Sequence, residues 1–465
     1  MSAWDLSAIE RGFRSFLDRA EEQPVAPRIA RGDVARELAE RYRFDAPHTL
    51  EEIVADVDRL LLTGNLHTTH PRYFGLFNPS VRFASAMADL MVATANPQVG
   101  AWFHSPAAVE IEEHVLRFFA RKFGLPEGTQ AHFTSGGSEA NLTAVLVAIA
   151  HHFPEARANG VRAIDGRPVL FASAESHHSF EKTAQHTGLG REALRIVATD
   201  DADRMRVDAL REAIAEAREK GHRPFFVAAT AGTTGTGAID PLPEIAALCR
   251  EEGLWLHADA AWGGAACLSP RLRPHLAGIE EADSITCDAH KWISAPMGAG
   301  MFFTRHAAAA AAAFGIHTPY VPKGEGAHPP DSYAATLQWS RRFMGLKVFM
   351  LLAELGEEGL ARQIERHAEV AEWLRRRLVE ERFDVTSASP LAVVCFEHPE
   401  AQRIARTVVD RGRCWVSPLV RENRPPAVRA CITNFETTVE DVNLLVEELV
   451  AARAASSRSP EPARA

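Results

Sequence analysis

The chain has 465 residues, of which 46% are hydrophobic and 24% are charged. Such fractions are typical of a globular enzyme, and the length allows two or three packed units. The formal net charge of -10 argues against a nucleic-acid partner, because proteins that bind nucleic acids usually present a basic face. No apolar stretch is as long as a membrane span, and the first residues lack the apolar core of a signal peptide. We therefore expect no membrane partner.

The six cysteines are scattered along the chain, and no pair has the spacing of metal ligands. Buried, reduced thiols are the simpler interpretation, and they are typical of a cytoplasmic protein. The sequence therefore predicts a cytoplasmic location and no metal site.

Helices are expected in about the first 65 residues, where apolar side chains recur at helical spacing, as at Ile53, Val57 and Leu60. From about residue 130, short apolar runs alternate with helical segments. This alternation predicts an α/β fold with a mostly parallel sheet and covering helices. The expected strands are residues 131–134, 169–173, 225–230, 254–258, 284–287 and 300–304.

The last third of the chain begins with a segment rich in Pro, Gly and His, residues 317–332, which has no periodicity and is predicted to be a loop. A short alanine-rich helix is expected before it, at residues 307–314. A long helix is expected after Arg341, followed by a small α+β unit with a strand at 391–396. The tail from residue 454 has low complexity and is predicted to be disordered.

The first motif that carries chemistry is TSGGSEAN at residues 134–141, between a predicted strand and an apolar helix. Glycines permit a tight turn, and a helix N-terminus presents N–H groups and the positive end of the helix dipole. The motif is consistent with a phosphate site. It is also consistent with a plain junction in which a serine caps the helix.

The second motif is HADAAW at residues 257–262, where another predicted strand ends. His257 and Asp259 are two residues apart, so they point to the same face of the strand. A buried carboxylate needs a partner, and a protonated ring nitrogen would serve. Alternatively, Asp259 only caps a loop.

The third motif is DAHKW at residues 288–292, after the predicted strand 284–287. A lysine that forms an imine needs a partly desolvated site, which Lys291 would find between His290 and Trp292. The alternative is a lysine whose stem packs at the sheet edge while its charge remains in water.

All three motifs follow predicted strands, and parallel sheets bind ligands beyond the carboxyl ends of their strands. Together they offer a phosphate site, a partner for a pyridinium nitrogen and a lysine for an imine. This combination predicts an enzyme that holds pyridoxal 5'-phosphate (PLP) on Lys291 and acts on an amino acid.

With these motifs, the chain resembles the PLP-dependent decarboxylases of the group that contains aromatic-amino-acid, glutamate, histidine and diaminobutyrate decarboxylases. The resemblance runs from HPRYF at residue 70 to RACITNFETTVEDV, which ends at residue 442. It implies a type I PLP fold with a seven-stranded, mostly parallel sheet and a small C-terminal α+β domain. It also implies a homodimer with shared active sites.

Four parts of the chain are expected on this basis. They are an N-terminal helical segment at 1–105 that contributes to the dimer and the substrate site, a large PLP-binding domain at 106–340, a small C-terminal domain at 341–453 and a disordered tail at 454–465.

The resemblance also implies roles for individual residues. Asp259 would hold the proton of the ring nitrogen, and Lys291 would form the imine. The other residues implied to bind the cofactor are Gly137 and Ser138 at the phosphate, His177 and Ala261 against the ring, Thr234 near the ring, and Asp288 and His290 beside the lysine. His177 is also expected to act in catalysis.

Decarboxylases of this group commonly carry a tyrosine on a mobile loop that helps to protonate Cα. Tyr333, eight residues before Arg341, is the nearest match, although the spacing is one residue shorter than in aromatic decarboxylases. Tyr320 is the alternative. A further departure is Ala289, where relatives often have proline.

The resemblance places the substrate near residues 70–79 and 100–106. Phe77, Trp102 and Phe103 could pack on an aromatic substrate, whereas Arg82 and His104 could face an acidic one. For any single one of these aromatics, a place in the core is the more usual role. We expect an L-amino-acid decarboxylase for an aromatic or other bulky substrate. The alternatives are an aldehyde synthase, another PLP lyase, an aminotransferase or a non-catalytic relative.

Overall fold

The computed structural model describes residues 10, 14, 22–78, 80–316, 331–421 and 424–456. The chain divides into two compact units. The larger unit comprises Val81–Ala371 and Thr386–Val394, and the smaller one comprises Met1–Ser80, Glu372–Val385 and Cys395–Ala465. The four-part division expected from the sequence stays a prediction.

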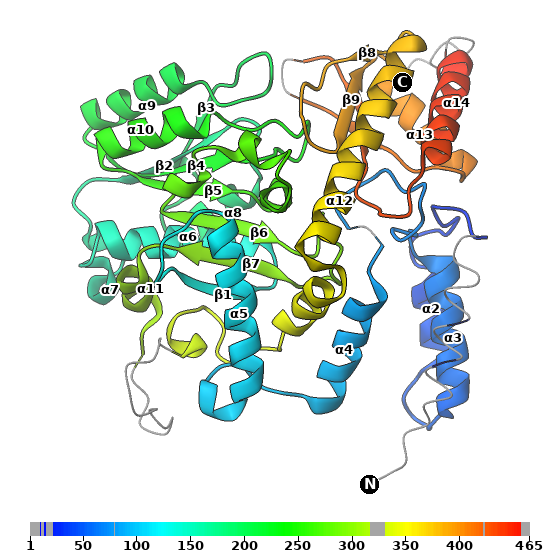
Figure 1. Cartoon of the computed structure of the whole chain (residues 1–465), viewed down its shortest axis with the longest axis horizontal. Helices are drawn as coiled ribbons and strands as arrows, with labels where there is room; N and C mark the ends of the chain where they lie inside the picture. Colours follow the sequence, from blue (N-terminus) through cyan, green and yellow to red (C-terminus); the bar gives the residue numbers. More distant parts are fainter. Residues whose placement is uncertain are drawn as a thin grey trace. The chain divides into compact units, whose positions relative to one another are not determined.

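The larger unit is built on a seven-stranded sheet in the order β1-β7-β6-β5-β4-β2-β3 (Figure 1). Its strands are β1 (Gln130–Thr134), β2 (Pro168–Ser173), β3 (Leu194–Val197), β4 (Arg223–Thr230), β5 (Trp255–Asp259), β6 (Ser284–Asp288) and β7 (Gly300–Thr304). Only β7 runs against its neighbours β1 and β6. The predicted mostly parallel α/β sheet is confirmed, and β3 is the strand that the apolar pattern did not indicate.

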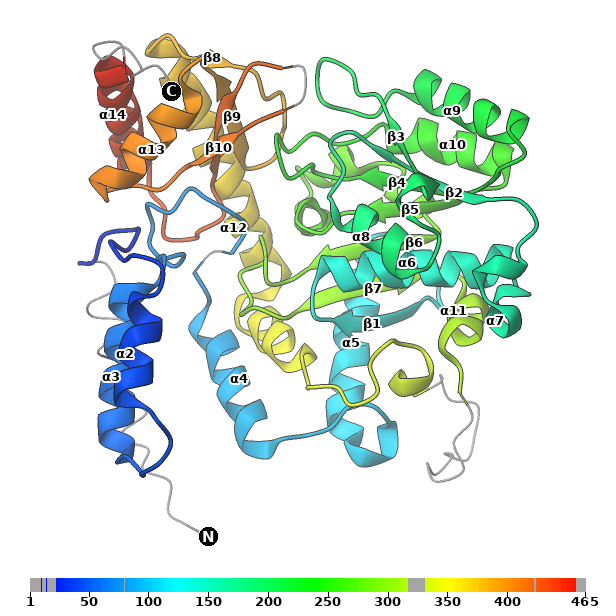
Figure 2. The ribbon, with the colours of Figure 1, turned by 180° about the vertical axis from the view of Figure 1, so that it is seen from behind.

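Helices cover both faces of this sheet, with α9 and α10 on one side and α6, α8 and α11 on the other (Figures 1 and 2). Strands β2 and β5 are therefore buried at every position. The helices of the larger unit are α4 (Phe83–Ala95), α5 (Pro106–Lys122), α6 (Gly137–His152), α7 (Ala156–Asn159), α8 (Ser179–His186), α9 (Val207–Glu219), α10 (Leu242–Glu252), α11 (Ala307–Phe314) and the first part of α12 (Gly345–Glu380). Helix α12 is kinked at Gly356, where φ is 64°.

Short 3-10 turns complete this unit. They are η1 (Trp102–His104), η2 (Val161–Ala163), η3 (Arg191–Ala193), η4 (Gly263–Leu268), η5 (Arg273–Leu276), η6 (Ile279–Glu281) and η7 (Ser332–Ala334).

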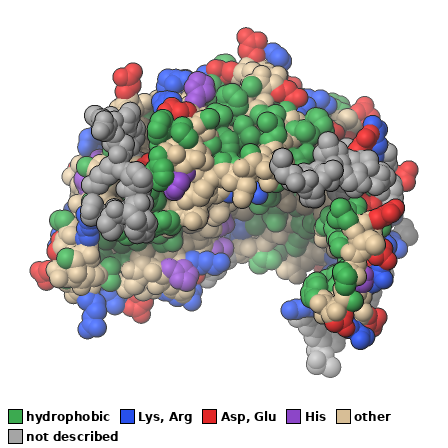
Figure 3. All heavy atoms as spheres, turned by 90° about the horizontal axis from the view of Figure 1, so that it is seen from below, with side chains coloured by type: hydrophobic (Ala, Val, Ile, Leu, Met, Phe, Trp, Pro, Cys, Tyr) green, Lys and Arg blue, Asp and Glu red, His purple; other side chains and the backbone are tan. Residues whose placement is uncertain are grey.

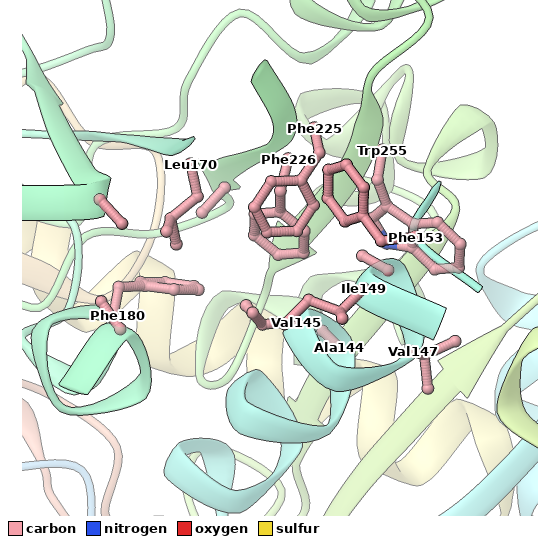
Figure 4. Close-up of a cluster of buried hydrophobic side chains, with 14 of the residues drawn as sticks. Ala144, Val145, Val147, Ile149, Phe153, Leu170, Phe180, Phe225, Phe226 and Trp255 are labelled. Carbon is pink, nitrogen blue, oxygen red and sulfur yellow. The ribbon is translucent and has the colours of Figure 1, made fainter. Parts of the chain in front are cut away.

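A core of large rings packs α6 onto the sheet (Figure 4). The ring centroids of Phe153 and Phe225 are 5.4 Å apart, in an edge-to-face arrangement that aromatic pairs prefer. Trp255 is buried in the same cluster, at the start of β5. This packing fixes the C-terminal end of α6 on the sheet.

The smaller unit has helices α2 (Asp33–Arg41), α3 (Leu50–Gly64), α13 (Ala401–Arg411) and α14 (Val439–Ser456). Thr49 and Glu52 form a capping box that starts α3. The second sheet has the order β10-β11-β9-β8, with β8 (Asp384–Val385), β9 (Val393–Glu397), β10 (Ser417–Leu419) and β11 (Ala427–Cys431). Helix α14 extends three residues into the segment that was expected to be disordered; the rest of that segment lies outside the described residues. Across the described ranges, every helix is too short or too polar to cross a bilayer.

Candidate active site

The three motifs meet at one edge of the large sheet. Strands β1 and β6 end there, and β7 begins there, because Gly300 pairs with both Thr134 and Asp288. A side chain at Gly300 would meet the Oγ1 atom of Thr134 and would lie 2.7 Å from Cα of Gly136. Only a glycine at the start of β7 therefore lets the glycine-rich turn close over the sheet.

The glycine-rich turn is bonded directly to the third motif. Gly137 begins α6, and its N–H donates to Oδ2 of Asp288 at 3.1 Å. A Cβ atom on Gly137 would lie 3.2 Å from that of Ala261, so the turn also reaches the second motif. Ser138 is solvent-exposed in the first turn of α6. The N-terminus of a helix with an exposed serine suits a phosphate group.

Lys291 lies beside a buried carboxylate. Its Nζ atom is 3.0 Å from Oδ2 of Asp288, whose side chain is 1% exposed. The Oδ1 atom of Asp288 has no hydrogen-bond partner within the part of the chain that the structure describes. His290 is 3.7 Å from the same carboxylate and accepts the N–H of Ala299 at Nδ1. Burial lowers the pKa of His290, and the charge of Asp288 opposes this effect.

Asp259 is buried at the end of β5, the strand next to β6. Oδ1 accepts the N–H of Ala261 at 3.1 Å, and Oδ2 accepts Nδ2 of Asn141 at 2.9 Å. Among the ion pairs of the described residues, none includes Asp259. A buried carboxylate that is bonded only to neutral donors has room for a cationic partner. The residues present therefore fit a protonated pyridine nitrogen.

His177 lies within electrostatic range of these groups. Its Nδ1 accepts the N–H of Ser179 at 3.1 Å, so Nε2 carries the proton of the neutral ring. Partial desolvation lowers the pKa of His177, and the negative charge of Asp259 opposes this effect. The positive charge of Lys291 lowers that pKa further. At neutral pH His177 is therefore an uncharged donor.

Two further predicted residues lie on segments that connect the elements of the larger unit. Thr234 lies in an exposed turn after β4. Tyr333 lies in η7, where its N–H donates to the carbonyl of Gly100 at 2.9 Å and its ring packs 5.1 Å from that of Trp339. Within the described chain, Tyr333 makes no hydrogen bond with Lys291. Tyr320 lies outside the described residues, as does most of the predicted loop 317–332.

The expected substrate residues differ in their availability. Phe77 is buried, and the guanidinium of Arg429 lies 4.6 Å above its ring centroid. Arg82 donates to Oε1 of Gln363 at 2.8 Å. Trp102 and Phe103 are exposed, with Phe103 packed on His104. Both exposed rings are available to a ligand or to a second subunit.

Sequence reasoning missed the part that Asn141 takes in this site. Asn141 stands one helical turn after Gly137, so the helix that begins at the glycine turn also carries the amide to Asp259. The signal was a polar residue at an otherwise apolar helix face, inside a motif already under consideration.

Comparisons with known proteins agree with this geometry. Residues 33–398 match the model of the pyridoxal-dependent decarboxylase conserved domain. Tryptophan decarboxylase 2 of Oryza sativa subsp. japonica is 30% identical over 363 residues, which are 75% of this chain and 72% of that protein. Phenylacetaldehyde synthase of Arabidopsis thaliana is 28% identical over 82% of this chain and 79% of that protein. A crystal structure of mouse CSAD is 25% identical with a TM-score of 0.89, over 96% of this chain and 98% of that one.

Proposed function

The chain belongs to the pyridoxal-dependent decarboxylase family, and on that premise we propose that it holds PLP on Lys291 and converts an aromatic or other bulky L-amino acid to the corresponding amine and CO2. The enzyme is a PLP-dependent carboxy-lyase of amino acids. The observation that supports the assignment of residues is the meeting of Lys291, Gly137 and buried Asp259 at adjacent strand ends.

Different residues would bind the phosphate and the ring of the cofactor. The first turn of α6, with Gly137 and Ser138, would bind the phosphate through N–H groups and the helix dipole. Ala261 leaves space for a flat ring, and neutral His177 would pack against it. Asp288 holds both the N–H of Gly137 and the ammonium of Lys291, so one carboxylate aligns the phosphate turn with the lysine. His290 supports this arrangement, and Thr234 would lie near the ring.

The chemistry depends on charge near the ring. When bound, PLP supplies an electron sink for the electron pair that remains at Cα when CO2 departs. Asp259 would hold a proton on the ring nitrogen and so make that sink effective. An acid must then deliver a proton to Cα, and Tyr333 is proposed for this step, with Tyr320 as the alternative.

Aldehyde synthesis is the second candidate, because a relative with that activity matches most of the chain. The same site would release aldehyde, ammonia and H2O2 if O2 reached Cα before a proton did, because O2 would take up two electrons and water would hydrolyse the resulting imine. The presence of His177 and of the candidate acid Tyr333 favours simple decarboxylation.

We also propose a homodimer with shared active sites in the cytoplasm. Large hydrophobic side chains are exposed on the larger unit, including Phe83, Met91 and Trp102, and they would be covered by a second subunit. Figure 3 shows hydrophobic side chains exposed on one face. All six cysteines are buried free thiols, as is usual in a reducing compartment.

A substrate panel tests the function. The PLP-loaded protein is incubated with single L-amino acids, and CO2, amine, aldehyde and H2O2 are measured together. Equal amounts of CO2 and amine from an aromatic substrate are expected. CO2 with aldehyde and H2O2 instead would establish the synthase, and no CO2 from any amino acid would refute the proposal.

A further inference from the structure

A continuous line of buried polar side chains leads through the sheet to Asp259. The indole N–H of Trp255 donates to Oγ of Ser284 at 2.9 Å, and that hydroxyl lies 2.8 Å from Nδ1 of His257. Nε2 of His257 lies 3.1 Å from Oδ1 of Asn141, whose Nδ2 donates to Asp259 at 2.9 Å. All five side chains are buried, with no more than 4% exposed.

The donors in this line can be assigned from its two ends. An ionised carboxylate only accepts hydrogen bonds, so Asn141 must turn Nδ2 toward Asp259. Oδ1 of Asn141 then faces the hydroxyl of Thr286 at 3.0 Å and Nε2 of His257. Because Oδ1 is an acceptor, a hydrogen bond between it and His257 requires the proton on Nε2.

The other end agrees with this assignment. Burial lowers the pKa of His257 to about 4, so the ring is neutral and Nδ1 is an acceptor. The hydroxyl of Ser284 can donate to Nδ1 while it accepts from Trp255, whose indole is only a donor. The opposite tautomer would set the lone pair of Nε2 against Oδ1 of Asn141. In that tautomer the Thr286 hydroxyl, 3.3 Å away, would be the only donor to Nε2 among the described residues, and Oδ1 of Asn141 would lose its bond to His257. The tautomer with the proton on Nε2 therefore satisfies more of these groups.

We infer that Asn141 is a positioning residue, which orients the Asp259 carboxylate toward the ring nitrogen of the cofactor, and that His257 in turn holds Asn141 in place. The inference rests on the proposed role of Asp259 toward the ring nitrogen. Asn141 and the N–H of Ala261 occupy one lone pair on each oxygen of Asp259, so the carboxylate cannot rotate without losing a bond.

A purely structural role for the line predicts something different. The bonds would then only satisfy buried polar groups, and their loss would lower stability without changing the ring nitrogen. The state of that nitrogen therefore separates the two interpretations, and it can be measured without turnover.

The experiment uses holoenzyme reconstituted with PLP that carries 15N in the ring. Asn141→Leu keeps the size of the side chain and removes its polar atoms. We expect its ring 15N signal to move toward the unprotonated value, and kcat to fall at least about ten-fold with KM nearly unchanged. Thr143→Val is the matched control, because it also removes a buried polar group from α6. The hydroxyl of Thr143 donates to the carbonyl of Glu139 and not to Asp259. Its signal and kcat should match the wild type.

A wild-type 15N signal in Asn141→Leu would overturn the inference, as would an equal loss of kcat in Thr143→Val. If Asn141→Leu does not fold, the test is which ring nitrogen of His257 carries the proton in the wild-type protein. A proton on Nδ1 instead of Nε2 would contradict the inference. The proposed function fails separately. If the wild-type protein shows no turnover but the cofactor's ring nitrogen still loses its proton in Asn141→Leu, the proposed activity is refuted and the inference stands.

Discussion

The Nζ atom of Lys291 lies 3.0 Å from Oδ2 of Asp288, and the same oxygen accepts the N–H of Gly137 at 3.1 Å. The lysine at the end of β6 and the turn that begins α6 are thus held by one buried carboxylate. This relationship connects the proposed attachment point of the cofactor to its proposed phosphate site.

Lys291→Ala should abolish both turnover and covalent attachment of the cofactor. Borohydride reduction of the PLP-loaded protein followed by peptide mass mapping tests this, with the solvent-exposed Lys182→Ala as the control. A reduced cofactor on any lysine other than Lys291 would contradict the assignment.

Asp259→Ala should still bind PLP on Lys291, because the carboxylate is proposed to act on the ring nitrogen and not on the lysine. Turnover should fall at least about 100-fold, which corresponds to about 2.7 kcal/mol of lost transition-state stabilisation. Cofactor content and kcat are measured on the same sample. A variant that retains most of its kcat would show that the ring nitrogen has another partner.

Tyr333→Phe should slow amine formation and raise the fraction of aldehyde, ammonia and H2O2, because a proton donor to Cα would be lost. Tyr320→Phe should change that fraction much less. The measurement is the ratio of amine to aldehyde in air for the wild type and both variants. The same ratio in Tyr333→Phe as in the wild type would remove Tyr333 from the mechanism.

Glu112→Ala should destabilise the larger unit by about 3–5 kcal/mol, since it leaves a buried guanidinium without its partner. Glu112 and Arg341 are both buried and lie 2.6 Å apart, and Glu112 also accepts the N–H groups of Met344 and Gly345 at the start of α12. Urea unfolding measures the change. The control is Glu113→Ala, which removes an exposed pair with Arg117 and should cost at most about 1 kcal/mol. Equal effects of the two variants would contradict the prediction.

The buried ring of His132 should make the fold sensitive to acid. Burial, with a smaller effect of Arg341, lowers the pKa of His132 from 6.5 to about 3. Between these pH values the unfolded chain binds a proton that the folded one excludes, so stability is lost as pH falls through that window. Each pH unit costs up to about 1.4 kcal/mol.

His132→Phe should remove this loss of stability, because phenylalanine does not titrate. The substitution breaks no hydrogen bond within the described chain, since neither ring nitrogen of His132 has a partner there. The free energy of unfolding should then fall less steeply between pH 6.5 and pH 4 than in the wild type. His275→Gln, which changes an exposed histidine, should keep the wild-type slope. A wild-type slope in His132→Phe would show that other groups cause the acid sensitivity.

The sequence by itself determined the strands that position the site and the motifs at their ends. Apolar runs marked β2, β4, β5 and β6 because a strand that is buried on both faces leaves a continuous hydrophobic segment. Spacing within a motif is local, so the shared face of His257 and Asp259 followed from the two-residue period of a strand. Strand β3 was not predicted because it is short and partly exposed at the sheet edge, so it leaves no continuous apolar run.

Only the tertiary structure decided which distant groups bond to one another. Asn141 and Asp259 are 118 residues apart, and their bond depends on how far α6 inserts over β5. The tautomer of His257 follows from that bond and from Ser284 on a neighbouring strand. The bond from the N–H of Tyr333 to the carbonyl of Gly100 joins residues far apart in the chain, and the loop pattern did not predict it. Hydrogen bonds depend on distances of a few tenths of an ångström and on which atom carries the proton, and these are set by packing between elements and not by the local sequence pattern.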